Sequence, residues 1–190
     1  CEASCTLNIV DSPVTIKSIE CSIVDKAWEN GWIKPQINQN KTNKKIGIIG
    51  SGPAGLAAAQ QLARAGHNVI IYETNKKMGG LLRYGIPDFK LEKTHIDRRL
   101  EQLSAEGVNF RCGVELGLNI EINDMIKEHD ALILACGAEK PRDLDIEGRN
   151  ADGIHFAMDF LPQQNRRIGK ETLEGLEETT ADGKHVVVIG

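Results

Sequence analysis

The feature that most constrains this chain is a glycine-rich turn between two runs of apolar, mostly β-branched residues. The turn, residues 50–55, reads Gly-Ser-Gly-Pro-Ala-Gly and follows the apolar run 46–49. An alanine-rich segment leads from it to Gly66, and a second apolar run, 69–72, ends in Glu73. Strand, glycine turn, helix, strand and acid, in this order, are typical of a dinucleotide-binding βαβ unit. The pattern predicts an α/β fold.

Each residue type in the turn has a physical role. Gly50 permits a tight turn, and Gly52 lacks a Cβ, so a pyrophosphate could approach its backbone. Gly55 allows the helix to pack closely on the strands. Pro53 suits the first helical turn, where its missing N–H is not needed. The free N–H groups and the dipole at the helix start favour phosphate charge.

Glu73 stands 23 positions after Gly50, at the end of the second expected strand. A carboxylate there can accept hydrogen bonds from both ribose hydroxyls, and it would repel a 2′-phosphate. This favours FAD or NAD over NADP at this site. The glycines alone would also fit an ordinary turn, but the flanking strands, the helix and the acid favour the nucleotide site.

A second glycine motif, Gly79-Gly80, follows the acid after a few polar residues. Bare backbone at this point could pass close to the pyrophosphate or the ribityl chain of a flavin. Plain NAD-dependent dehydrogenases do not usually carry such a pair, so it favours FAD. The alternative interpretation is a flexible turn without a ligand.

Composition excludes several classes of function. The chain has 190 residues and a formal charge of −4, which gives no electrostatic reason to expect nucleic acid or an anionic membrane as a partner. No apolar run approaches the ~20 residues that span a bilayer. No signal peptide is visible, although the chain opens at Cys1 without Met. Five cysteines, an odd number, argue against a secreted disulfide framework and favour the cytoplasm.

Cys1 and Cys5 open the chain at a spacing that leaves two interpretations. They could be ordinary thiols, or the end of a longer cysteine array that holds an iron–sulfur cluster. Cys136 is interpreted as a structural thiol or as a backbone neighbour of the flavin rather than as a redox thiol. Trp28 and Trp32 are expected to anchor a core.

Periodicity and breaker residues predict the remaining elements. A helix is expected to start at Ser12 and Pro13 and to stop at Gly31, and a polar linker follows. The other expected elements are a helix over 94–106, a strand over 108–112, a helix over 122–128, a buried parallel strand over 130–138, a helix start within 151–164, a surface loop over 165–183, and a strand over 184–190 that repeats the pattern of 45–50.

Taken together, these motifs resemble the family of small (β) subunits of bacterial NADPH-dependent glutamate synthase. The resemblance rests on the opening cysteines, the segment 13–17, the turn 50–55, the stretch Gly-Gly-Leu-Leu-Arg-Tyr-Gly-Ile-Pro at 79–87, Ala-Cys-Gly-Ala at 135–138, and His-Phe-Ala-Met-Asp-Phe-Leu at 155–161. It covers essentially the whole chain. Dihydropyrimidine dehydrogenase and the flavin subunit of the bifurcating transhydrogenase carry the same module.

The resemblance implies specific site residues. In the family a helical N-terminal region holds two [4Fe–4S] clusters, and Cys1, Cys5 and Glu20 match ligand positions. Lys90 stands where relatives usually have Arg, and Cys136 stands where they usually have Thr. The positions that match FAD contacts are Gly50, Gly52, Pro53, Ala54, Gly55, Glu73, Gly80, Leu81, Lys90, Leu116 (a backbone contact to the adenine) and Gly137.

The resemblance also implies the organisation and the activity. Residues 1–40 would end a helical iron–sulfur domain, 44–183 would form the first part of a Rossmann-like FAD domain with a three-layer parallel sheet, and 184–190 would begin an NADPH domain. Electrons would pass from NADPH through FAD and the clusters to a large subunit that makes glutamate from glutamine and 2-oxoglutarate. No catalytic acid or base is assigned, and these 190 residues alone are expected to be inactive. Alternatives are a related transhydrogenase or pyrimidine reductase subunit, a flavin-binding subunit without turnover, and a plain NAD-binding dehydrogenase.

Overall fold

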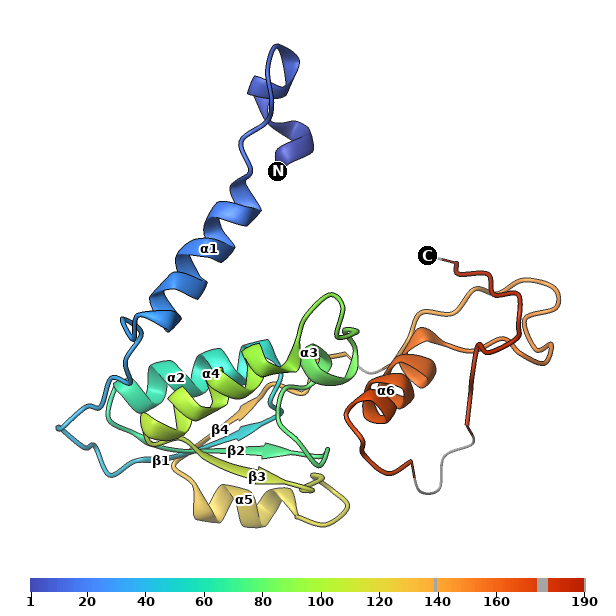
Figure 1. Cartoon of the computed structure of the whole chain (residues 1–190). Helices are drawn as coiled ribbons and strands as arrows, with labels where there is room; N and C mark the ends of the chain where they lie inside the picture. Colours follow the sequence, from blue (N-terminus) through green and yellow to red (C-terminus); the bar gives the residue numbers. More distant parts are fainter. Residues whose placement is uncertain (139, 174–177, 190) are drawn as a thin grey trace. The chain divides into compact units, whose positions relative to one another are not determined.

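The computed structural model describes residues 1–138, 140–173 and 178–189. The chain divides into two compact units, Cys1–Pro35 and Gln36–Gly190. Figure 1 labels their helices and strands.

Unit 1 contains two short 3₁₀ turns, Glu2–Ser4 and Thr6–Ile9, and the helix α1, Ile16–Glu29. None of the residues in these elements is buried. The predicted helix start at Ser12 and Pro13 is wrong, because α1 begins at Ile16 after Thr15, whose side chain makes no capping bond. The predicted stop is confirmed, since Gly31 adopts the left-handed φ of 63° just after the helix ends.

The prediction that the tryptophans anchor a core is wrong for Trp32, which is 68% exposed. Trp28 is partly buried. The physical reason is that unit 1 has only one helix of more than one turn in this chain, so its apolar face has no second element to pack against.

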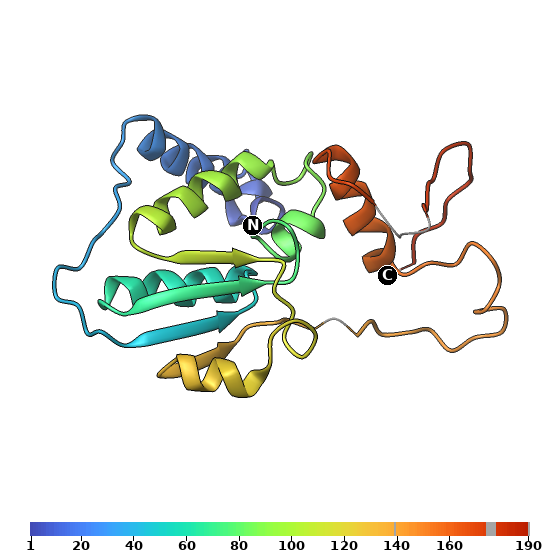
Figure 2. The same cartoon turned by 90° about the horizontal axis from the view of Figure 1, so that it is seen from below.

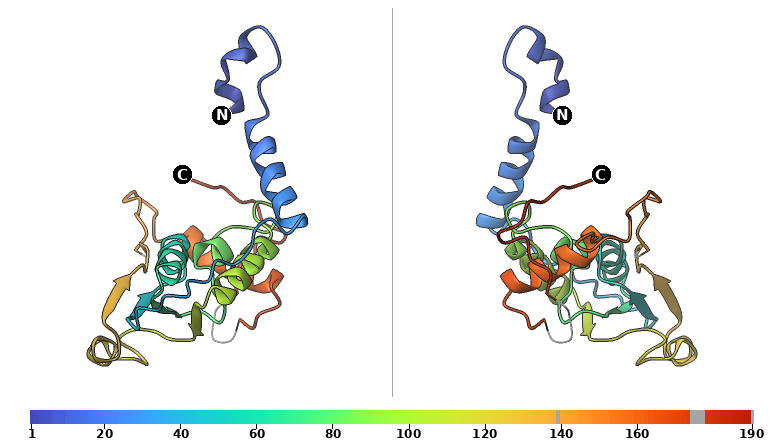
Figure 3. Two further views of the ribbon diagram at one scale, coloured as in Figure 1. Left: turned by 90° about the vertical axis from the view of Figure 1, so that its left-hand side faces the viewer. Right: turned by 90° about the vertical axis from the view of Figure 1, so that its right-hand side faces the viewer.

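Unit 2 is built on a parallel sheet in the order β3-β2-β1-β4. Helices α2 and α4 cover one face and α5 covers the other, which Figures 1 and 2 and the side views in Figure 3 show. The prediction of a three-layer α/β fold with a parallel sheet is thus confirmed. The bounds are β1 Lys45–Ile49, α2 Pro53–Arg64, β2 Asn68–Glu73, α4 Lys93–Ala105, β3 Asn109–Cys112, α5 Ile122–Glu128 and β4 Ala131–Leu134.

The core lies between the sheet and helices α2 and α4. The central strands β1 and β2 pair in register, with Ile48 opposite Ile71, and both residues are fully buried. The small alanines of α2 allow the helix to approach the sheet closely, as Ala59 with no exposed surface shows. The predicted buried strand 130–138 is wrong in length and burial, because β4 is a four-residue edge strand and Leu134 is 68% exposed.

Helices α3, Leu81–Tyr84, and α6, Ala157–Ile168, lie side by side beyond the sheet (Figure 1). The helix predicted to begin within 151–164 is therefore present. The surface loop predicted from residue 165 is wrong at its start, since α6 continues to Ile168 and Asn165 is buried. The Asn165 amide nitrogen donates to the Tyr84 carbonyl at 2.8 Å, and this hydrogen bond offsets part of the cost of burying the polar side chain.

Residues 184–189 form no strand in the structure, and Val187 and Val188 are 84% and 86% exposed. The strand expected over 184–190 stays a prediction, and Gly190 lies outside the described residues. Among the residues that the structure describes, no helix has the length and apolarity to cross a membrane.

Candidate dinucleotide site at the end of the sheet

The glycine turn connects β1 to α2 at the carboxyl ends of the parallel strands, where nucleotides bind in folds of this kind. Gly50 has a φ of 102°, and a Cβ built on it would lie 2.4 Å from the carbonyl oxygen of Ala135. A Cβ on Gly55 would lie 2.1 Å from the carbonyl oxygen of Gly50. Both glycines are therefore required by the protein's own packing.

Gly52 differs from Gly50 and Gly55 in having room for a side chain. Its φ of −66° suits any residue, and a Cβ built there would meet nothing within 4 Å. The fold itself therefore does not need glycine here, but a ligand that approaches this backbone would. Gly52 is the N-cap of α2 and Pro53 is its first residue, so unpaired N–H groups of the first turn are available beside the open space.

Glu73 ends β2 and is held against the glycine turn. It is 6% exposed, and one of its oxygens accepts hydrogen bonds from the backbone N–H of Ser51, at 3.2 Å, and from the Ser51 hydroxyl. The other oxygen accepts bonds from the N–H and the side-chain amide of Asn75, at 2.9 and 2.7 Å. The carboxylate is thus fixed in orientation beside the turn.

The glycine doublet also meets the turn. The N–H of Gly79 donates to the Ser51 hydroxyl at 2.8 Å. A Cβ on Gly80 would lie 2.9 Å from the Cα of Gly52, so the two backbones are in close contact. Ser51, with no exposed surface, therefore joins the first turn, the acid and the doublet.

Ser51 is the residue that sequence reasoning missed. A serine between two glycines is an unremarkable turn residue, and no local signal shows that its hydroxyl bridges segments 22 and 28 residues away. The glycine doublet was recognised as a motif, but its contact with Gly52 required the fold.

Three other residues predicted to contact FAD are Leu116, Gly137 and Leu81. Leu116 packs beside the ends of β1 and β2, in a cluster that contains Ile49 and Tyr72. Gly137 has a φ of 75° and open space around its Cβ position, two residues after the Ala135 carbonyl that faces Gly50. Leu81 begins α3 directly after Gly80 and is 54% exposed.

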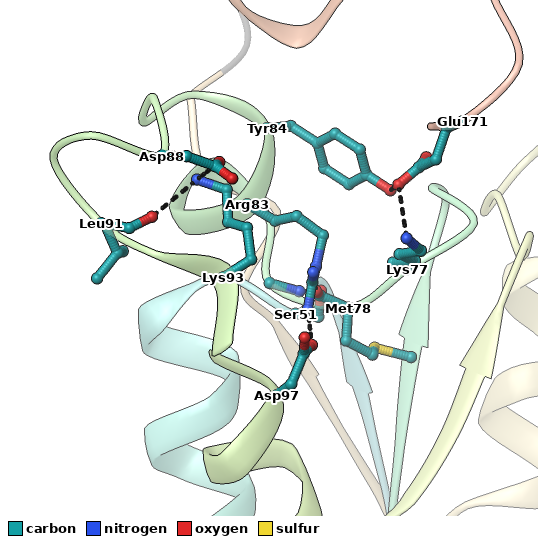
Figure 4. Close-up of polar contacts among 11 residues, drawn as sticks. Ser51, Lys77, Met78, Arg83, Tyr84, Asp88, Leu91, Lys93, Asp97 and Glu171 are labelled. Atoms are coloured by element: carbon teal, nitrogen blue, oxygen red, sulfur yellow. Dashed lines mark hydrogen bonds and ion pairs between the residues drawn. The ribbon is translucent and has the colours of Figure 1, made fainter. Parts of the chain in front are cut away.

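Lys90 is an exposed residue of the loop after α3, with its ammonium 5.9 Å from the centroid of the Phe89 ring. The loop itself is held from α4. The Lys93 ammonium donates to the carbonyls of Ile86 and Leu91 at 2.5 and 3.1 Å, and it pairs with Asp88 at 3.1 Å (Figure 4). Lys93 thus fixes the loop that carries Lys90, and the flavin contact of Lys90 stays a prediction.

Cys112 lies opposite Glu73 in the pairing of β3 with β2. Desolvation and then the negative charge of Glu73 raise the pKa of its thiol. The thiol therefore stays protonated near neutral pH and is no candidate nucleophile. The arrangement as a whole offers backbone donors, open space and one fixed carboxylate, which suits binding of a dinucleotide rather than acid–base chemistry.

Cys1, Cys5 and Glu20 lie in unit 1. Backbone hydrogen bonds from Val14 and Leu7 lower the pKa of the partly buried Cys5 thiol, which favours the thiolate that metals bind. Across the described ranges there is no group of three or more His, Cys, Asp or Glu side chains that could hold a metal ion. These residues alone therefore do not complete a four-ligand cluster site.

Comparison with known proteins gives close relatives in sequence. The glutamate synthase (NADPH) small chain of Mycobacterium tuberculosis is 50% identical over the whole of this chain, which covers 40% of that relative. The corresponding small chain of Bacillus subtilis is 48% identical, with 38% of its length covered. The glutamate synthase (NADH) of Schizosaccharomyces pombe is 48% identical, with 9% covered. The chain thus spans about two fifths of the bacterial small chains it matches.

Solved structures agree on the fold. Mycobacterium tuberculosis FprA in complex with NADPH superposes with a TM-score of 0.60 at 27% identity, covering 65% of this chain and 29% of FprA. A 2-naphthoyl-CoA reductase superposes with a TM-score of 0.54 at 27% identity, covering 70% of this chain and 19% of the reductase. The family described as pyridine nucleotide-disulphide oxidoreductase matches residues 44–190, which include the turn, the acid and the doublet. The chain therefore belongs to the pyridine nucleotide-disulphide oxidoreductase family.

Proposed function

We propose that this chain binds FAD and serves NADPH-linked electron transfer within a glutamate synthase-like enzyme. One observation carries the proposal: the Ser51 hydroxyl bonds to both Glu73 and the Gly79 N–H, so that turn, acid and glycine doublet are joined beside Gly52, whose Cβ position meets no atom within 4 Å. The glycine doublet favours a flavin over a plain nicotinamide nucleotide. The relatives at 48–50% identity, which are named as glutamate synthases, support the setting.

The residues of this chain would bind and orient the cofactor. The first-turn N–H groups of α2, after Gly52, would hold the pyrophosphate. The Glu73 carboxylate would accept the ribose hydroxyls in exchange for some of the hydrogen bonds that it accepts here from Ser51 and Asn75. Leu116 would lie against the adenine, and Gly80, Leu81, Lys90 and Gly137 would follow the rest of the molecule. FAD, when bound, supplies the hydride and one-electron chemistry.

Three further parts of the proposal concern the longer protein. Cys1, Cys5 and Glu20 would contribute to [4Fe–4S] ligation together with cysteines outside this chain. NADPH would bind in a domain that begins near Val186, and a large subunit would receive the electrons and make glutamate in the cytoplasm. Iron and acid-labile sulfide content, with electron paramagnetic resonance of the reduced protein, would test the cluster. An iron-free protein that still reduces its partner would contradict the proposed role of the cluster.

A pair of glycine substitutions tests the flavin site in the complete reading frame. Gly52→Ala adds a Cβ where the protein has open space, so its urea midpoint should stay at the wild-type value while FAD binding weakens at least about tenfold. Gly55→Ala, whose Cβ would meet the Gly50 carbonyl, should lose stability first. Unchanged FAD affinity in a folded Gly52→Ala protein would refute the proposed site.

A related NADPH-dependent flavin oxidoreductase is the second candidate, which the superposition on FprA with NADPH favours. Co-purification with a large subunit, and glutamate formation by that complex, would separate the two. NADPH oxidation by these 190 residues alone is not expected. A flavin that NADPH fails to bleach in the complete protein would instead indicate a binding subunit without turnover.

A further inference from the structure

Arg83 is a buried cation that none of the predicted contacts uses. It is 7% exposed and lies in the single-turn helix α3. Its Nε donates to the Met78 carbonyl at 2.6 Å, and its Nη2 forms a hydrogen-bonded ion pair with Asp97 on α4. Figure 4 shows the guanidinium between these two partners.

The segment beside Arg83 needs an external restraint. Gly79 and Gly80 adopt φ values of 129° and 52°, and glycines lose more backbone freedom than other residues when they are fixed. Helix α3, which follows them, has four residues and cannot be stable alone. The contact of Gly80 with Gly52 therefore depends on groups outside the doublet.

Arg83 supplies such a restraint from a long helix. Its Nε holds the carbonyl directly before the doublet, while Asp97 ties the same guanidinium to the 13-residue helix α4. A Cβ on Gly79 would lie 3.0 Å from the Cβ of Arg83, so the arginine stem also packs against the doublet. The Nε and Nη2 donors of the guanidinium are directed to protein groups, which favours a structural role for them over phosphate binding.

We propose that Arg83 is a positioning residue. Held by Asp97, it fixes the turn from Met78 to Gly80 in the conformation that meets Gly52 and completes the flavin site. The inference rests on the proposed function, and it assigns to the pair Arg83–Asp97 a role in flavin affinity although neither residue is among the predicted FAD contacts.

The experiment compares four variants in the complete reading frame: Asp97→Asn, Arg83→Lys, Arg83→Met and, as a matched control, Asp124→Asn in the exposed pair with Lys127 on α5. FAD affinity is measured by flavin fluorescence, global stability by urea unfolding, and local order by hydrogen exchange of the Gly79 and Gly80 amides in the flavin-free protein. Asp97→Asn leaves the doublet and the arginine untouched, so it remains informative if Arg83→Met fails to fold.

The expected result is about tenfold weaker FAD binding in Asp97→Asn, a larger loss in Arg83→Met and partial rescue in Arg83→Lys. Exchange of the Gly79 and Gly80 amides should speed up while the urea midpoint of Asp97→Asn stays near that of Asp124→Asn. Unchanged affinity and exchange in Asp97→Asn would overturn the proposal and leave the flavin site standing. Absence of FAD binding in the wild type would instead overturn both.

Discussion

At the scale of single residues, the site depends on where the backbone has no room for a side chain. Gly50, Gly55 and Gly80 each face another backbone segment at a distance that excludes a Cβ, whereas Gly52 faces open space. The first three are therefore constrained by folding, whereas the fourth would be constrained by the ligand that the proposed function places there. Ser51 connects the same segments through its hydroxyl.

Ser51→Ala should weaken both stability and flavin binding. The substitution leaves the buried N–H of Gly79 without its acceptor and removes one donor from Glu73. We expect a loss of about 1–3 kcal/mol in the free energy of unfolding. Urea unfolding would measure it, with Ser104→Ala on the exposed side of α4 as the control. A Ser51→Ala protein as stable as Ser104→Ala would contradict the bridging role.

Part of the site at this scale was predictable from sequence, because the tight turn at Gly50, the close packing at Gly55 and the place of Glu73 at the end of β2 follow from covalent geometry and spacing. The bridge through Ser51 was not, since it joins residues that are neighbours only after β2 has paired with β1. The position of Lys90 was not predictable either. Its loop has no periodicity, and its course is set by Lys93 from another element.

At the scale of elements, helices α2 and α4 are joined by a buried polar network at the end of the layer away from the glycine turn. Glu106, 1% exposed, follows α4 and accepts hydrogen bonds from Arg64 and Gln60 of α2 and from Gln102 of α4. The backbone N–H of Gln36 completes the set at 3.2 Å. This carboxylate fixes the spacing of the two helices that cover the core.

Glu106→Gln should destabilise unit 2 by about 3 kcal/mol, because it leaves Arg64 without its buried partner. Burial alone would raise the pKa of the Glu106 carboxyl, but hydrogen bonds from Arg64, Gln36 and Gln60 outweigh burial and lower the pKa. The stabilisation is therefore present above the unfolded pKa of about 4.3 and is lost as the pH falls through the folded value. Urea midpoints from pH 6 to 3 should fall less steeply in the variant; equal slopes would contradict this.

Tyr84 of α3 contacts the segment that follows α6, because its hydroxyl donates to Glu171 at 3.1 Å. Burial, and then the charge of Glu171, raise the pKa of Tyr84 to about 12. The stability from this group is complete below the unfolded pKa of about 10 and is lost as the pH rises through the folded value. Tyr84→Phe should therefore lose less stability than the wild type between pH 10 and pH 12.

Tyrosinate absorbance gives a second measurement of the same prediction. The chain has two tyrosines, and burial raises the pKa of the other one, Tyr72, as well. The folded protein should show little tyrosinate absorbance at pH 10, whereas the urea-unfolded chain should be about half ionised. Ordinary titration in the folded protein would show that both hydroxyls reach solvent.

Element type was more predictable than element ends. The helices α4 and α5 and the strands β1 and β2 follow directly from periodicity, because each has one clearly apolar face or a continuous apolar run. The start of α1 was wrong because Ser12 and Pro13 satisfy the local capping pattern without being used. The end of α6 was wrong because Asn165 is buried by a tertiary bond to Tyr84 that no sequence pattern shows.

At the scale of the whole molecule, the two units differ in what holds them together. Every residue of the two hydrophobic core clusters belongs to unit 2. Unit 1 exposes Ile9, Val10 and Ile23, which are 82%, 86% and 62% exposed. A helix of 14 residues without a packed face is marginal in water. Unit 2 should therefore fold independently of unit 1.

The polar segment before β1, which was predicted as a linker, is hydrogen-bonded to the end of α2 and the turn after it in unit 2. The Asn38 side chain donates to the Arg64 carbonyl at 2.8 Å, and the Thr42 N–H donates to the Gly66 carbonyl at 3.0 Å. A Cβ on Gly66 would lie 2.2 Å from the Asn40 carbonyl, so the segment passes in direct contact with the turn after α2. These bonds, with that of Gln36 to Glu106, make the segment part of the folded unit.

Two truncations separate the contribution of unit 1 to stability from that of the polar segment before β1. Removal of residues 1–35 deletes no residue of the core clusters, so the urea midpoint of unit 2 should stay at the wild-type value. Removal of residues 1–43 also deletes the bonds of Gln36, Asn38 and Thr42 and exposes the end of the Glu106 network. It should therefore cost about 2–4 kcal/mol, from the loss of these three hydrogen bonds, one of them to a buried charge. Equal midpoints for the two truncations would show that the segment is only a tether, and a large loss on removing 1–35 would show that unit 1 stabilises unit 2.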